Sequence, residues 1–121
     1  MKSKLIITFL LFQILFFVGC EYEKIPAPIP PKNVSFKNDV EKIFSSSCLP
    51  CHATGGAAPD LSAVNAWNDL TFGGYVTDST NLSNNTLFKE INSGSMPPNS
   101  ALSPRDTAII FTWIRKGFRD N

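Results

Sequence analysis

The chain has 121 residues, which corresponds to one domain, and its apolar share of 43% is sufficient for a hydrophobic core. Its 11 basic and 10 acidic residues give a net charge of +1 without any basic run, which excludes a nucleic-acid-binding surface. Three cysteines and one histidine are present, so the residue types that carry metal or redox chemistry are scarce.

The beginning of the chain is typical of an export signal. Lys2 and Lys4 precede an apolar run from Leu5 to Val18. A short positive end followed by such a run indicates a secretory signal peptide. The run is shorter than the roughly 20 residues of a membrane-spanning helix, and a signal anchor that stays attached is the alternative.

The apolar run ends in Phe17, Val18, Gly19 and Cys20. This junction resembles a bacterial lipoprotein signal, in which a cysteine after small residues is lipidated and becomes the new N-terminus, although Phe17 stands where Leu is usual. The resemblance implies a lipoprotein signal peptide at residues 1–19 and a membrane anchor on Cys20. The protein is then exported and attached to a bacterial membrane, on the periplasmic side or at the cell surface. A stray free thiol is the alternative, but lipidation accounts for the odd number of cysteines.

Residues 20–33 predict a tether. Four prolines lie between residues 26 and 31, and proline-rich segments form extended, semi-rigid spacers. An irregular arm packed on the domain is the alternative. The folded domain is expected from residue 34 to residue 121.

Helical patterns dominate this domain. Ser35 is suited to cap a helix that begins at Phe36, and Pro50 should end or kink that helix just before it. Near the other end, Ser103, Pro104 and Asp106 form a helix start with a capping box. The expected buried faces of these two helices are Phe36, Val40, Ile43 and Phe44, and Ile109, Ile110, Trp113 and Ile114.

Shorter helices are predicted from Leu61 to Leu70 and from Thr86 to Asn92, with Gly94 just beyond the second. Gly73 to Val76 is expected to form a short strand or turn at most. The predicted fold class is therefore all-α, with loops between short helices.

The three residues Cys48, Cys51 and His52 have the spacing i, i+3 and i+4, which places them on one face of a helical turn. Two thiols and an imidazole would then point at one bound metal or cofactor. Zinc would need a fourth ligand, and the mature chain offers no further Cys or His for it. A dithiol redox centre would need a strand and a βαβ setting. Covalent haem c needs only Cys-x-x-Cys-His, and the motif favours it.

At this motif the domain resembles the small monohaem cytochromes c, and most of all the single-domain cytochromes of bacterial lipoproteins. The resemblance covers about Val34 to Phe118 and rests on a helix before the motif, an aromatic C-terminal helix and a late methionine. It implies a cytochrome c-like domain in which N- and C-terminal helices cross around one covalent haem. The candidates for the helix contact are Phe36, Phe44, Ile110 and Trp113.

Haem iron would need a second axial ligand opposite His52, and methionine is the leading choice because no other histidine is present. Met96 is the only methionine that remains after removal of the signal. It precedes Pro97 and Pro98, which should stiffen its loop, and the resemblance implies that a methionine before proline is the ligand. A core methionine that fills a gap is the alternative.

Further contacts with the haem are expected from three residues. A metal-bound histidine donates its second N–H to an acceptor, and the resemblance implies the carbonyl of Pro59 for this role. Trp67 and Tyr75 are candidates to pack on the haem edge or to bond a propionate. Each of these two aromatics could equally be plain core.

The resulting hypothesis is an iron-containing electron-transfer protein and not an enzyme. Its expected partners are redox proteins or membrane oxidoreductase complexes, and whether it is a subunit of a larger oxidoreductase stays open. One alternative is a haem protein that reacts with small ligands or peroxide through a displaceable methionine. Another is a docking lipoprotein whose haem serves mainly for folding.

Overall fold

The computed structural model describes residue 29 and residues 31–121. The predicted signal peptide, Cys20 and most of the predicted tether lie outside these residues. The elements in chain order are η2 (Phe36–Val40), α2 (Glu41–Ser47), α3 (Leu49–His52), α4 (Ala66–Phe72), η3 (Leu82–Asn84), α5 (Thr86–Asn92) and α6 (Pro104–Arg115). No strand occurs among the described residues, so the predicted all-α fold class is confirmed. None of the helices in this part of the chain is both long enough and apolar enough to cross a membrane.

The first helix begins where the sequence predicted. The Ser35 hydroxyl accepts a hydrogen bond from the Asn38 N–H at 3.2 Å, and the Asp39 carboxylate accepts one from the Ser35 N–H at 2.8 Å. The first turn, η2, is π-helical, and α2 continues it to Ser47. The predicted break before Pro50 is also present, because Pro50 lies in the separate short helix α3.

The last helix starts with the predicted cap. The Ser103 hydroxyl accepts a hydrogen bond from the Asp106 N–H at 3.1 Å and donates one to the Asp106 carboxylate at 2.7 Å. Helix α6 then runs to Arg115, and Gly117 follows with a φ of 91°, which favours glycine. The four predicted core residues of this helix are buried.

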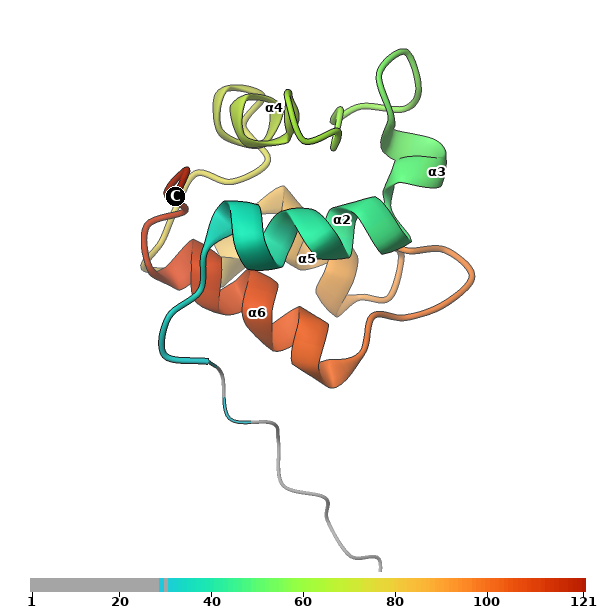
Figure 1. Ribbon diagram of the computed structural model, residues 1–121. Helices are drawn as coiled ribbons and strands as arrows, with labels where there is room; N and C mark the ends of the chain where they lie inside the picture. Colours follow the sequence, from blue (N-terminus) through green and yellow to red (C-terminus); the bar gives the residue numbers. More distant parts are fainter. Residues whose placement is uncertain (1–28, 30) are drawn as a thin grey trace, which may run out of the picture.

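The helices at the two ends of the domain, η2 and α6, lie against each other (Figure 1). Aromatic side chains form this contact. The ring of Phe36 lies 5.0 Å from that of Trp113 and 6.3 Å from that of Phe44, measured between centroids. Each of these three side chains is 1% exposed, and Ile110 is fully buried. Aromatic pairs of this kind contribute about 0.5–1.5 kcal/mol beyond the area that they bury. All four predicted core residues therefore lie in the core that holds η2 against α6.

Helix α4 begins at Ala66, so the predicted start at Leu61 is wrong. The Asp60 carboxylate accepts hydrogen bonds from the Ser62 N–H at 2.9 Å and from the Asn65 amide at 2.7 Å. The side-chain hydroxyl of Ser62, followed by its N–H, is the main reason that the pKa of Asp60 lies well below its usual range. These contacts hold the segment in a turn that competes with the helix. Gly73 to Val76 also forms turns rather than a strand.

Helix α5 has the predicted bounds and lies against α6, with 4.6 Å between the ring centroids of Phe88 and Phe111. Its entrance is fixed by Asn85, a fully buried residue that the sequence did not single out. The Asn85 amide oxygen accepts from the N–H groups of Thr77 and Asp78 at 2.7 and 2.9 Å. In this way a buried polar side chain anchors the loop that leads into α5.

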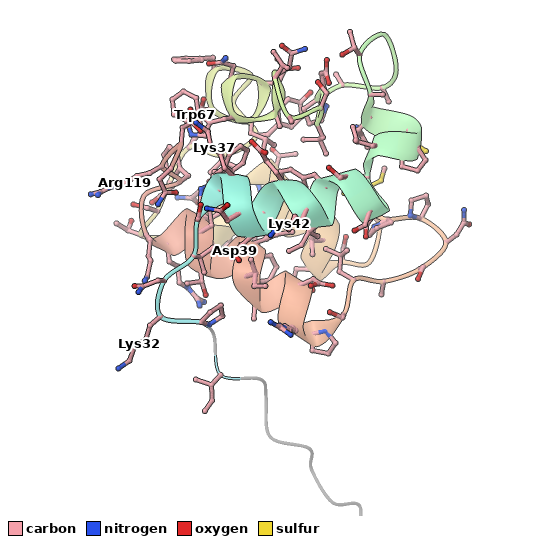
Figure 2. All side chains as sticks on the ribbon, viewed as in Figure 1. Lys32, Lys37, Asp39, Lys42, Trp67 and Arg119 are labelled. Carbon is pink, nitrogen blue, oxygen red and sulfur yellow. The ribbon has the colours of Figure 1, made fainter. Side chains whose placement is uncertain are left out.

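The chain enters the domain at the end opposite α3. Lys116 donates a hydrogen bond to the Lys32 carbonyl, and the Lys37 N–H donates one to the carbonyl of Asn121 at 3.0 Å. Figure 2 shows Lys32 and Arg119 at this end, away from the Cys-x-x-Cys-His segment. The two termini of the described domain are therefore held together on one side.

Candidate functional site

The Cys-x-x-Cys-His segment forms a compact turn at the end of α2. The N–H groups of Cys51 and His52 both donate to the Cys48 carbonyl, at 3.1 and 3.0 Å. Cys51 is exposed, whereas Cys48 and His52 are half-buried. Burial raises the pKa of the Cys48 thiol to about 11, so this sulfur is a neutral thiol at physiological pH.

The loop after the motif folds back over the imidazole of His52. The Nδ1 atom lies 3.1 Å from the carbonyl oxygens of both Ala57 and Pro59. Because both neighbours are acceptors, Nδ1 carries the hydrogen and donates it, which leaves the lone pair on Nε2. The backbone adds a further bond, from the Leu61 N–H to the His52 carbonyl at 2.7 Å. The imidazole is thereby held in one tautomer.

Gly56 allows this loop to approach the motif closely. A Cβ atom at position 56 would lie 2.6 Å from the Cys51 carbonyl oxygen and 3.0 Å from that of Ala53. No side chain fits at the first of these distances. The path of the loop that carries the two carbonyl acceptors therefore depends on this glycine.

A cavity of about 510 Å³ opens in front of the motif and is lined by Cys48, Cys51, His52 and Met96. Its volume lies within the range of about 300–1,000 Å³ that is usual for cofactor and ligand sites. Most of the remaining wall is apolar: Phe44, Leu61, Tyr75, Leu87, Ile91 and Leu102. The structure thus brings together the four residues predicted to bind the haem and its iron around one apolar space.

Helix α5 supplies one wall of the cavity through Leu87, Glu90 and Ile91. Their spacing of i, i+3 and i+4 places them on one helix face. Among the described residues that line the cavity, Glu90 is the one acidic side chain, and it is half-buried. The sequence analysis missed it, although the same spacing rule that identified the cysteine motif would have found this face.

Met96 reaches the cavity from the loop that follows α5. Its side chain is 40% exposed, and Pro97 and Pro98 line the cavity beside it. The Met96 N–H donates to the Glu90 carbonyl at 3.1 Å, which ties the loop to the end of the helix. A thioether and an imidazole therefore border the same space from different parts of the chain.

The three residues expected to support the site lie in different surroundings. Pro59 and Tyr75 line the cavity, and Pro59 is buried. Trp67 is not among the lining residues, because its indole N–H donates to the Phe118 carbonyl at 2.8 Å. Of the roles left open for Trp67, this contact favours packing of α4 on the C-terminal segment.

The chemistry of the donors fits a covalently held haem. Two thiols are available for thioether bonds, and an imidazole nitrogen and a thioether sulfur can serve as axial ligands. The apolar wall suits a large, flat macrocycle. Zinc or a dithiol centre would use the thiols and the imidazole but would leave the cavity and the thioether without a role.

Comparison with known proteins agrees with this geometry. A family model described as "Cytochrome C oxidase, cbb3-type, subunit III" matches residues 37–114, which is more than half of the chain. No curated protein and no solved structure matches the chain. The matched segment runs from η2 into α6 and includes the cysteine motif, the wall of α5 and Met96. The chain is therefore a small c-type cytochrome and belongs to this family.

Proposed function

We propose that the protein is a membrane-tethered monohaem cytochrome c that transfers single electrons between redox partners. The haem c is bound through Cys48 and Cys51, with His52 and Met96 as axial ligands. The observation that carries this proposal is the cavity, because it gathers all four side chains around one apolar space.

Haem c supplies reversible one-electron chemistry at its iron. The chain contributes a fixed imidazole, since the carbonyls of Ala57 and Pro59 orient His52 and increase its basicity. Met96 contributes a neutral thioether, and a methionine ligand raises the reduction potential. The apolar wall excludes water from the cavity. Exclusion of water also raises the reduction potential, because an apolar environment disfavours the more highly charged oxidised form.

The ligand set would distinguish a carrier from an enzyme. If His52 and Met96 both held the haem iron, no coordination position would be left for a substrate. The exposure of Met96, at 40%, supports one competing function: a haem protein that binds small ligands or peroxide after displacement of the methionine. Rapid carbon monoxide binding by the reduced protein, or peroxide turnover, would establish that function instead.

The charge distribution supports docking through an uncharged surface. Residues 43–59 and 91–104 flank the cavity and contain no Asp, Glu, Lys or Arg. Redox proteins or membrane oxidoreductase complexes with a similarly uncharged surface around their own cofactor are the partners that we propose. The family description names an oxidase subunit, so a membrane oxidase is one such partner.

The proposed location is a bacterial membrane, on its periplasmic side or at the cell surface, with lipid on Cys20 and residues 20–33 as a tether. An extended spacer at about 3.1 Å per residue would reach roughly 40 Å. The position of Lys32 supports this arrangement, since the tether would enter the domain at the end away from the cysteine motif (Figure 2). Cys20→Ser should leave the precursor unprocessed or release soluble protein, and a protein with Cys20 intact that washes off membranes in salt would contradict the lipid anchor.

The central test is the state of the haem. The purified protein should keep its haem on a denaturing gel, because two thioether bonds survive unfolding. Cys48→Ser and Cys51→Ser should each abolish normal maturation. Haem that is lost from the wild-type protein under denaturing conditions would refute covalent attachment at this motif.

A further inference from the structure

The segment between α5 and Met96 is organised by the hydroxyl of Ser93. This hydroxyl donates to the Glu90 carbonyl at 3.2 Å. It lies 2.7 Å from the Ser95 hydroxyl and 3.4 Å from the Ser95 N–H, both of which can donate to it. One side chain thus connects the last turn of the helix with the residue that directly precedes Met96.

The same Glu90 carbonyl also accepts the Met96 N–H at 3.1 Å. The Ser93 hydroxyl and the Met96 N–H therefore share one acceptor, so the two hydrogen bonds close a ring together with the backbone from Ser93 to Met96. Gly94 completes the turn with a φ of 76°, a conformation that favours glycine, and its N–H donates to the Ile91 carbonyl at 3.1 Å.

This ring has little help from side-chain packing. Residues 92–96 are all exposed, so no apolar contact in a core holds the approach to Met96. On the other side, Pro97 is half-buried and lines the cavity, and residues 98–101 are exposed before Leu102 is half-buried again. On the side of the helix, the hydrogen bonds at Ser93 and the Met96 N–H bond to the Glu90 carbonyl therefore restrain the direction in which Met96 leaves the helix.

From these contacts we infer that Ser93 is a positioning residue for the Met96 thioether. Ser93 does not line the cavity, and it acts through the Glu90 carbonyl and the Ser95 backbone. Its hydroxyl holds the loop in the conformation that presents the sulfur, which strengthens methionine coordination against competing ligands. This inference rests on the proposed role of Met96 as axial ligand.

The test measures displacement of the methionine in the oxidised holoprotein by imidazole, followed in the absorption spectrum. Ser93→Ala should bind imidazole roughly fivefold more tightly than wild type, which corresponds to the loss of about one hydrogen bond. It should also weaken the far-red sulfur-to-iron band. Ser95→Ala should change both readouts in the same direction, and by less.

Two controls separate positioning from general destabilisation. Ser93→Thr keeps a hydroxyl at the same place and should restore wild-type imidazole affinity. Ser100→Ala removes a hydroxyl from the exposed loop beyond Met96 and should leave both readouts unchanged. Wild-type behaviour of Ser93→Ala would overturn the inference, as would an equal effect of Ser100→Ala.

Met96→Ala distinguishes this inference from the assignment on which it rests. If Met96 is the ligand, this variant should lose the far-red band and bind imidazole most tightly. A Met96→Ala protein that matches wild type in both readouts would refute the ligand assignment, and the role of Ser93 with it. A clear effect of Met96→Ala without any effect of Ser93→Ala would refute only the role of Ser93.

Discussion

The imidazole Nδ1 of His52 lies 3.1 Å from the carbonyl oxygen of Pro59, which is buried. The two residues are separated by an exposed loop whose path depends on Gly56. An acceptor on the second nitrogen of a metal-bound histidine raises the basicity of that ligand. The loop thus links a backbone constraint to the electronic properties of the proposed iron ligand.

The first prediction concerns Gly56→Ala. The added Cβ would meet the Cys51 carbonyl at 2.6 Å, so the loop must shift and carry the Ala57 and Pro59 carbonyls away from His52. We expect a higher reduction potential, because a less basic histidine stabilises the oxidised iron less, and a lower melting temperature. Ala53→Ser, an exposed change in the same loop at a residue that does not line the cavity, is the control and should keep the wild-type potential. Equal reduction potentials of wild type and Gly56→Ala would contradict the proposed effect of this loop on the basicity of His52.

The second prediction concerns the acidic wall residue. Glu90→Gln removes a negative charge from the wall of an otherwise mostly apolar cavity. A nearby negative charge favours the oxidised iron, so its removal should raise the reduction potential by tens of millivolts, which corresponds to about 1 kcal/mol. Redox titration measures this shift. Glu41→Gln makes the same chemical change on α2 and should leave the potential close to that of wild type.

The third prediction concerns partner docking. Because residues 43–59 and 91–104 carry no Asp, Glu, Lys or Arg, the rate of electron exchange with a redox partner should change little with ionic strength. Ala58→Lys combined with Asn99→Lys places two charges on exposed positions of these segments. Stopped-flow measurements should then show a clear salt dependence for the variant only. A steep salt dependence of the wild-type rate would argue for a different docking surface.

The fourth prediction concerns acid stability. The Asp78 carboxylate accepts hydrogen bonds from the Thr80 hydroxyl and N–H, both at 2.7 Å, and from the Asn81 N–H at 3.0 Å. The Thr80 hydroxyl contributes most to a pKa of Asp78 that is well below its usual range. A depressed folded-state pKa stabilises the protein above the unfolded-state value of about 4, and this stabilisation is lost as the pH falls below it.

Asp78→Asn should therefore lower the melting temperature at pH 7, and the difference from wild type should shrink as the pH falls below about 4. Thermal unfolding at a series of pH values measures this. Asp120→Asn is the control, since Asp120 makes only an exposed ion pair with Lys37 at 3.4 Å. A constant difference between wild type and Asp78→Asn from pH 7 to pH 3 would contradict the role of this carboxylate.

Local sequence signals were sufficient to predict the main helices. Ser35 and Ser103 cap the first and last helices as expected, because a cap depends only on hydrogen bonds within four residues. The periodicity of apolar residues identified Phe36 and Trp113 as buried, and the resemblance to the small cytochromes c implied the contact between their helices. The predicted start of α4 was wrong because the Asp60 carboxylate binds a backbone N–H that a longer helix would use. The periodicity of apolar residues contains no information on this hydrogen bond.

By itself, the sequence determined the cysteine motif and the all-α class, since each depends on residue type and short spacing. It also supplied the candidate axial pair, because His52 is its one histidine and Met96 the one methionine beyond the predicted signal. Only the tertiary structure decided that Tyr75 lines the cavity whereas Trp67 bonds the Phe118 carbonyl, and that Glu90 borders the apolar space. Two aromatic residues with similar propensities are indistinguishable in a sequence. Their surroundings are set by contacts between distant segments, because only packing of α4, α5 and the C-terminal residues determines which side chain meets which surface.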